Sequence, residues 1–148
     1  MRIEPLKIGD EEKVSEICQK CIREINAKDI TEKQVKVLLD EFSVKGIILY
    51  SEKYKVYVAK NEKKEIIGTG TLANNQIKGV FVDIEYLGKG VGKAIMIFLE
   101  NNAKEFGYKK TMLTSSTYAR KFYLKLGYKQ IKIIDSIVGE MTEMEKAI

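Results

Sequence analysis

Residues 86–94 read Tyr86-Leu-Gly-Lys-Gly-Val-Gly-Lys-Ala94, with glycine at every second position from Gly88 to Gly92. A β-like run, Lys78-Gly-Val-Phe-Val-Asp83, precedes this stretch, and an apolar-periodic run typical of a helix, Val91 to Phe106, follows it. Glycine allows positive φ and a close backbone approach to a ligand, and the first N–H groups of a helix lack partners within the helix. With the positive end of the helix dipole, these features predict a cradle for a phosphate or pyrophosphate.

The loop alone does not match the common nucleotide-binding motifs. Leu87 stands where a Walker A sequence has its first glycine, and Ala94 replaces the Ser or Thr. The third glycine comes one residue too early for the dinucleotide fingerprint. A glycine-rich turn without a ligand therefore stays an alternative on this evidence.

A second motif follows one predicted helix and one predicted strand later. It reads Ser115-Ser-Thr-Tyr-Ala-Arg-Lys-Phe-Tyr-Leu-Lys-Leu-Gly-Tyr128. With both motifs at this separation, the chain resembles the GNAT superfamily of N-acetyltransferases, which transfer acetyl from acetyl-CoA to amines. The family's loop, Gln/Arg-x-x-Gly-x-Gly/Ala, is matched by residues 87–92 except at Leu87. Its later pattern, Asn-x-x-Ala-x-x-x-Tyr-x-x-x-Gly-Phe/Tyr, is matched at Ala119, Tyr123, Gly127 and Tyr128, with Ser116 in place of Asn.

The resemblance spans about residues 55–130 and implies an acetyl-CoA site, with acetyl-CoA as the acetyl donor and no metal. Free N–H groups from Leu87 to Gly92 are expected to hold the pyrophosphate, and Val82 is expected to polarise the thioester carbonyl through its N–H and so stabilise the oxyanion. The predicted contacts are Phe81, Val82, Leu87, Gly88, Lys89, Gly90, Val91, Gly92, Lys93 and Ser116. Two of these have alternatives: the lysines can be merely solvated, and Ser116 can cap the next helix.

Tyr123 is the residue predicted to carry proton transfer. A phenol with a pKa of about 10 stays protonated at pH 7 and can donate to a departing CoA thiolate. The alternative is that Tyr123 only packs a short helix together with Phe122 and Leu126. No unique general base is visible: Asp83 and Glu85 lie near the cofactor strand but are also typical solvated loop acids, and water is a third candidate.

The composition excludes several classes of site. The chain contains no histidine, which removes histidine triads, histidine bases and histidine-containing zinc sites. Its only cysteines, Cys18 and Cys21, have the spacing of one helix face. This spacing favours two small buried apolar groups over a redox or metal site.

The bulk properties indicate one N-acetyltransferase (GNAT-like) domain over residues 1–148. The net charge of +5 is spread along the chain, and nucleic acid is not an expected partner because no arginine cluster or RNA-binding aromatic motif occurs. No signal-peptide or membrane-spanning run is visible, so a cytoplasmic location without membrane association is expected. The acceptor, a small-molecule or protein amine, stays open, as does a homodimer. A non-catalytic acyl-CoA sensor or interaction module of the same fold is the rival interpretation.

The element order predicts an α/β fold of the α+β type. Strands are expected at 2–8, 55–59, 65–72, 76–82, 111–114, 128–134 and 140–145, the second to fourth forming an antiparallel meander. Helices are expected after Asp10 and Thr31 as N-caps, and at 91–106 and 118–126, whereas Phe42 to Tyr50 has no clear assignment. This order predicts a mixed, mostly antiparallel central sheet with helices on both faces.

Overall fold

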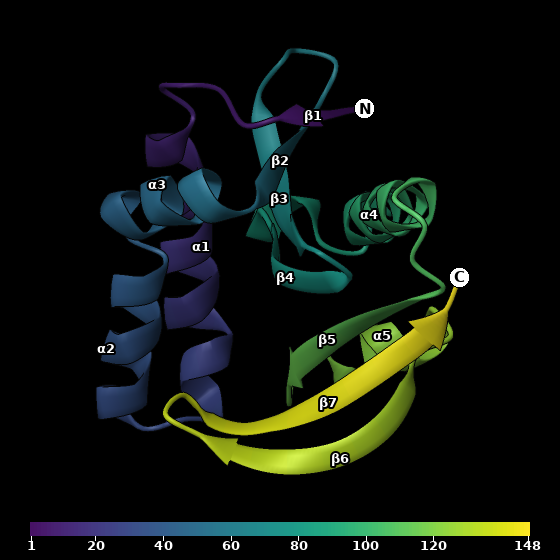
Figure 1. Cartoon of the computed structure of the whole chain (residues 1–148). Helices are drawn as coiled ribbons and strands as arrows, with labels where there is room; N and C mark the ends of the chain where they lie inside the picture. The colour runs from purple at the N-terminus through teal and green to yellow at the C-terminus, as the bar shows by residue number, and fades with distance from the viewer.

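The computed structural model, which describes residues 1–148, contains the predicted elements in the predicted order and one further helix. One sheet is connected by α-helices and two 3₁₀ turns (Figure 1). The helices are α1 (Glu11–Glu24), α2 (Glu32–Glu41), α3 (Val44–Lys53), α4 (Val91–Glu105) and α5 (Arg120–Lys125), with the turns η1 (Asn26–Lys28) and η2 (Ile84–Tyr86). The strands are β1 (Arg2–Pro5), β2 (Lys55–Lys60), β3 (Ile66–Ala73), β4 (Gln76–Val82), β5 (Lys110–Ser116), β6 (Lys129–Ser136) and β7 (Gly139–Ala147).

The sheet has 7 strands in the order β1-β2-β3-β4-β5-β7-β6. Every neighbouring pair is antiparallel except β4 and β5, which confirms the mixed, mostly antiparallel sheet and the β2–β4 meander. The parallel pair is short, because only Gln76↔Met112 and Ile77↔Leu113 are in register. Beyond Ile77 the two strands diverge and open a fork in the middle of the sheet, visible in Figure 1.

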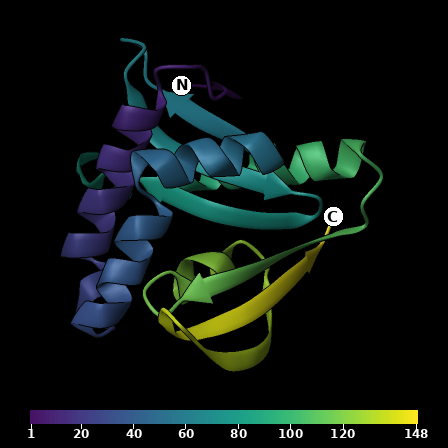
Figure 2. The same cartoon turned by 60° about the vertical axis from the view of Figure 1, so that its left-hand side comes forward.

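Helices cover both faces of the sheet, as predicted (Figure 2). Side chains alternate between the faces along β2: Tyr57 and Ala59 join the apolar cluster under α4, whereas Val58 joins the cluster under α1. Ile95 and Leu99 of α4 are buried in the first cluster. The two apolar clusters pack against β4 from both sides, and β4 forms one arm of the fork.

The added helix is α3, which the sequence left unassigned. Its N-cap is Ser43, whose Oγ accepts a hydrogen bond from the Gly46 N–H at 3.1 Å. The predicted cap of α2 is confirmed, since Thr31 and Gln34 form a reciprocal capping box. Asp10 is the N-cap residue of α1, as predicted, but its carboxylate accepts from the Lys7 N–H and no helix N–H donates to it.

Two element lengths also need correction. The first strand ends at Pro5, before the expected residue 8, and the helix expected at 118–126 is α5, Arg120–Lys125. The pairing with β2 does not stop at the proline, because the N–H of residue 5 would face away from β2 and the Leu6 N–H still donates to the Val56 carbonyl at 2.9 Å. None of the helices combines the length and apolar content that crossing a bilayer requires.

The last residue of the second motif has a role inside the fold. The Tyr128 hydroxyl donates to Glu100 Oε2 at 2.8 Å and pairs with Thr111 Oγ1 at 2.7 Å. Lys146 Nζ donates to the other Glu100 oxygen at 3.0 Å. This buried network links α4 to β5 and β7. It thereby holds β5, the second arm of the fork, in place relative to the helix that begins at the glycine loop.

We expect Tyr128→Phe to lower the free energy of unfolding by about 1–2 kcal/mol, because Glu100 and Thr111 lose a shared buried partner. Chemical denaturation measures the effect. Turnover per folded molecule should not change, since the Tyr128 hydroxyl is used within this network. Unchanged stability would show that the network does not contribute as described.

Candidate active site

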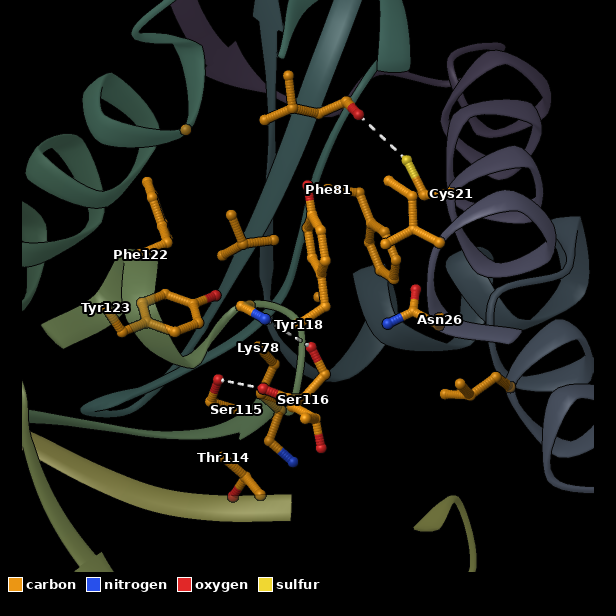
Figure 3. Close-up of a pocket in the computed structure, with 18 of the residues that line it drawn as sticks. Cys21, Asn26, Lys78, Phe81, Thr114, Ser115, Ser116, Tyr118, Phe122 and Tyr123 are labelled. Carbon is orange, nitrogen blue, oxygen red and sulfur yellow. Dashed lines mark hydrogen bonds between the residues drawn. The ribbon is translucent and has the colours of Figure 1, made fainter. Parts of the chain in front are cut away.

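A single cleft of about 600 Å³ occupies the fork between β4 and β5. The glycine loop and the start of α4 border one end of it, and α1, η1, α2 and the turn between β6 and β7 border the other. Side chains from both arms of the fork and from α1 converge on this space in Figure 3. The cleft is the place where the two sequence motifs meet.

The glycine loop has the backbone geometry of an anion cradle. Gly88 and Gly90 have φ values of +73° and +84°, in the left-handed region that favours glycine, and Gly90 is the N-cap of α4. No N–H from Gly88 to Lys93 donates a hydrogen bond within the protein. The expectation of a free N–H at Leu87 is wrong, because this group donates to the Ile84 carbonyl at 3.3 Å. The run of free donors therefore begins at Gly88.

The third glycine of the loop also serves packing. A Cβ added at Gly92 would lie 3.1 Å from Cζ of Phe122, so glycine here lets α5 pack against the first turn of α4. Of the two loop lysines, Lys93 lines the cleft and forms no ion pair, whereas Lys89 Nζ lies 5.3 Å from the ring centroid of Tyr86 and does not line the cleft. Val91 is buried at the base of the loop.

The end of β4 presents main-chain groups to the fork. The Asp83 N–H donates to the Ile67 carbonyl of β3 at 2.8 Å. Hydrogen-bonding direction alternates along an antiparallel strand, so the N–H and C=O of Val82 point away from β3 and toward the fork. The Val82 carbonyl accepts a hydrogen bond from the Cys21 thiol at 3.1 Å, and Phe81 lines the cleft beside it (Figure 3).

Tyr123 lies across the fork from this strand, on α5. Its ring packs edge-on against Phe122 and Tyr128, with centroid distances of 5.1 and 5.9 Å, and its side chain is 8% exposed. The hydroxyl has no partner in the protein and points toward the cleft in Figure 3. Burial raises the pKa of this phenol above its ordinary value, so the proton is held firmly at neutral pH.

Ser116 lines the cleft at the end of β5, and its Oγ accepts from the Ala119 N–H at 3.3 Å. This bond orients the turn that leads into α5, but Ser116 does not cap the helix, because the N-cap of α5 is Ala119 and no side chain caps it. The hydroxyl still has its own proton to donate to a ligand.

The two acids near the cofactor strand do not line the cleft. Asp83 Oδ1 accepts from the Glu85 N–H at 3.0 Å, which places Asp83 in a local turn. Three other carboxylates, Asp29, Glu41 and Glu140, do line the cleft, and sequence reasoning missed all of them. They belong to separate segments that only the tertiary fold brings to one space, so no local pattern marks them.

The cysteines are free thiols on the inner face of α1. Cys18 and Cys21 are 0% and 5% exposed, in agreement with the predicted buried pair. Burial raises the pKa of Cys21 to about 11, so this thiol is protonated at neutral pH and is a weak nucleophile. No group of three or more His, Cys, Asp or Glu side chains is arranged to hold a metal ion.

A forked mixed sheet, free N–H groups at a glycine-bounded helix start and an open strand edge meet at one cleft, whose loop end suits a phosphate-bearing ligand. The family model of the acetyltransferase (GNAT) domain matches residues 26–145, so the chain belongs to the GNAT acetyltransferase family. No match was found among the curated protein sequences.

Solved structures show the same fold. A GCN5-related N-acetyltransferase from Rhodopseudomonas palustris is 21% identical, with a TM-score of 0.87 over 99% of this chain and 95% of that one. The PaiA N-acetyltransferase from Thermoplasma acidophilum, in complex with coenzyme A, is 20% identical, with a TM-score of 0.80 over 99% of this chain and 98% of that one. An aminoglycoside 6′-N-acetyltransferase complexed with coenzyme A is 12% identical, with a TM-score of 0.66 over 99% and 97% of the two chains.

Leu87 is the one departure from the family's loop pattern. Its side chain is 39% exposed and lines the cleft next to the free donors. We expect Leu87→Arg to tighten acetyl-CoA binding about fivefold, because a guanidinium there adds an exposed ion pair to the pyrophosphate. Isothermal titration at low and high salt measures the gain, which should shrink as salt screens it.

Leu124→Arg is the matched control for Leu87→Arg, since Leu124 is 44% exposed and does not line the cleft. It adds the same charge to the protein away from the loop. An equal gain in both variants would mean that net charge alone draws the anion to the protein.

Proposed function

We propose that the protein is an N-acetyltransferase in which a primary amine attacks acetyl-CoA directly and Tyr123 acts as general acid. The observation that carries this proposal is the convergence of three groups on one cleft: the free N–H groups from Gly88 to Lys93, the open edge at Val82, and the Tyr123 hydroxyl. The first suits a pyrophosphate, the second a thioester carbonyl, and the third a leaving thiolate.

The proposed reaction uses each group once. The loop binds the pyrophosphate, and the edge of β4 aligns the pantetheine arm so that the Val82 N–H faces the carbonyl oxygen. The amine nitrogen forms a bond to the carbonyl carbon, and the charge that develops on oxygen is stabilised by this N–H. When the C–S bond breaks, the electron pair goes to sulfur, which takes the proton of Tyr123. The phenolate recovers a proton released by the acetylated nitrogen through water.

A cysteine acyl-enzyme is the less favoured route. Cys21 lies beside Val82, but its thiol donates a hydrogen bond to the Val82 carbonyl, and burial raises its pKa to about 11. Little thiolate is therefore present at neutral pH. Water is the proposed carrier of the amine proton, since Asp83 and Glu85 do not line the cleft. The cytoplasmic location and the homodimer stay predictions.

The experiment that tests this function is a titration with acetyl-CoA followed by a thiol-release assay over a panel of primary amines. Micromolar binding and amine-dependent thiol release support it. Binding without turnover on any amine would favour the acyl-CoA sensor.

The pH dependence follows from the direction of the Tyr123 shift. A phenol with a raised pKa keeps its proton up to alkaline pH, so the acid is not lost between pH 6 and 9. The acceptor attacks as the free base, and aliphatic amines have pKa values of about 10. We expect kcat/KM to rise about tenfold per pH unit through this range. A pH–rate profile that falls above pH 7.5 would contradict a protonated Tyr123 as the acid.

A further inference from the structure

The far end of the cleft, which α1, η1, α2 and the turn between β6 and β7 border, has an apolar wall on the side of α2. Leu38 and Phe42 are four residues apart at the end of α2, and both line the cleft. The Phe42 ring packs edge-on against Tyr50 at 5.7 Å and against Phe81 of β4 at 4.9 Å between centroids. Leu38, Tyr50 and Phe81 are only half-buried, so this wall keeps apolar surface that a ligand can cover.

Hydrogen bonds and close packing hold the wall in place. The Phe42 carbonyl accepts a hydrogen bond from Ser15 Oγ at 2.8 Å and another from Gln19 Nε2 at 3.0 Å, and both donors belong to α1. A Cβ added at Gly79 would lie 3.1 Å from Cε1 of Phe42, so glycine at this point of β4 leaves room for the ring. A pocket wall that is formed before the ligand arrives binds it without the cost of ordering side chains.

The turn between β6 and β7 supplies a second apolar side. Val138 and Met141 line the cleft and are half-buried. A Cβ added at Gly139 would lie 2.7 Å from Cγ2 of Ile30, so this turn packs against the segment between η1 and α2. Figures 1 and 2 both place the turn beside the ends of α1 and α2. The far end therefore has apolar side chains on two sides, contributed by α2 and by the β6–β7 turn.

The charges at the far end disfavour an acceptor that carries a carboxylate. Its charged lining residues are all acidic, namely Asp29, Glu41 and Glu140. The only cationic side chains that line the cleft are Lys78 at the fork and Lys93 at the loop. A carboxylate at the far end would lie among like charges without a cation to pair with, whereas an uncharged apolar group meets no such penalty.

We propose that the acceptor is a small arylalkylamine, a primary amine whose aromatic ring packs between the α2 wall and the β6–β7 turn. The reacting nitrogen lies at the fork, near the Val82 N–H and the Tyr123 hydroxyl. It exchanges one proton for the acetyl group, and the CoA sulfur receives a proton through Tyr123. This inference rests on the proposed function, since it names the acceptor class of the same cleft.

The test compares kcat/KM for 2-phenylethylamine with that for ethylamine, which has the same reacting end without the ring. Rates are expressed per free base, so that a difference in amine pKa does not enter. Burial of the ring predicts an advantage of about 30-fold. The advantage should persist at high salt, because salt screens charges and does not weaken apolar contacts. Phenylalanine, which adds a carboxylate to the same amine, should react at least about tenfold more slowly than 2-phenylethylamine.

Leu38→Ser combined with Val138→Ser makes both sides of the far end more polar. We expect about a tenfold loss of kcat/KM for 2-phenylethylamine and less than about twofold for ethylamine, with the Kd for acetyl-CoA unchanged. Leu49→Ser combined with Ile137→Ser is the matched control, since both side chains are exposed and neither lines the cleft. If thermal unfolding shows that the first double variant does not fold, Val138→Ser alone is compared with Ile137→Ser, and about a threefold loss is expected.

Three results would overturn the inference and leave the proposed function intact. The first is equal kcat/KM for 2-phenylethylamine and ethylamine. The second is an equal loss in the cleft variant and its control. The third is a faster reaction with spermidine or with a peptide amine than with 2-phenylethylamine.

A separate measurement covers the case in which no amine is acetylated. 2-Phenylethylamine is titrated into the CoA-loaded protein, and the two double variants are titrated in parallel. Binding that weakens about tenfold in the Leu38→Ser, Val138→Ser variant and not in the control retains the inference while the proposed function fails. Absence of binding to the unmodified protein overturns the inference as well.

Discussion

Tyr123→Phe is expected to lower kcat about 100-fold or more and to leave the Kd for acetyl-CoA within about twofold. The substitution removes only the hydroxyl, which points into the cleft and has no partner in the protein. The ring contacts with Phe122 and Tyr128 are kept, so the fold and the loop should not change. Steady-state kinetics with a saturating amine, together with isothermal titration of acetyl-CoA, separate the two quantities.

Variants of two other tyrosines provide the comparisons for this result. Tyr108→Phe is the control for loss of a phenol, because Tyr108 packs against the core and does not line the cleft. Tyr118 is the rival acid, since it lines the cleft and is 57% exposed. Undiminished turnover in Tyr123→Phe, or a larger loss in Tyr118→Phe, would contradict the assignment of the proton to Tyr123.

Gly90→Val is expected to weaken acetyl-CoA binding about 30-fold, which corresponds to about 2 kcal/mol. Gly90 has a φ of +84°, and left-handed backbone costs an L-residue about 1–2 kcal/mol, more when the side chain is β-branched. No atom lies within 4 Å of an added Cβ, so the variant should fold. Relief of the strain rotates the free N–H groups away from the pyrophosphate, and the cost then appears in the binding constant.

Gly107→Val separates this effect from general strain. Gly107 follows the other end of α4, has a φ of +93° and also has no atom within 4 Å of an added Cβ. It should lose stability in thermal unfolding without a loss of acetyl-CoA affinity. Equal affinities for acetyl-CoA in the Gly90 and Gly107 variants would show that the loop is not part of the binding site.

Features governed by neighbouring residues could be predicted from the sequence. The β2–β4 meander follows from short apolar runs between polar turns, and the cap of α2 follows from Thr31 and Gln34. The loop and the Tyr123 motif were recognisable because each keeps its residues within one short segment. The two motifs meet in one cleft because of the order of the helix and the strand that separate them in the sequence.

The features that could not be predicted from the sequence depend on tertiary contacts. Helix α3 was missed because Gly46 in its first turn resembles a helix breaker, although a Cβ there would lie 2.0 Å from the Glu41 carbonyl oxygen and glycine is therefore required. Ser43 three residues earlier was the available signal. The bonded N–H of Leu87 depends on η2, a single 3₁₀ turn without a distinctive pattern. The carboxylates that line the cleft come from separate segments, and two of them, Asp29 and Glu140, are more than a hundred residues apart in the sequence.

Release of free CoA from acetyl-CoA in the presence of a primary amine, with the acetylated amine identified by mass, tests the central claim most directly. The account predicts amine-dependent release in equal amounts with the acetylated product, and loss of that release in Tyr123→Phe while acetyl-CoA still binds. Binding of acetyl-CoA without release on monoamines, polyamines or peptide amines would contradict the account.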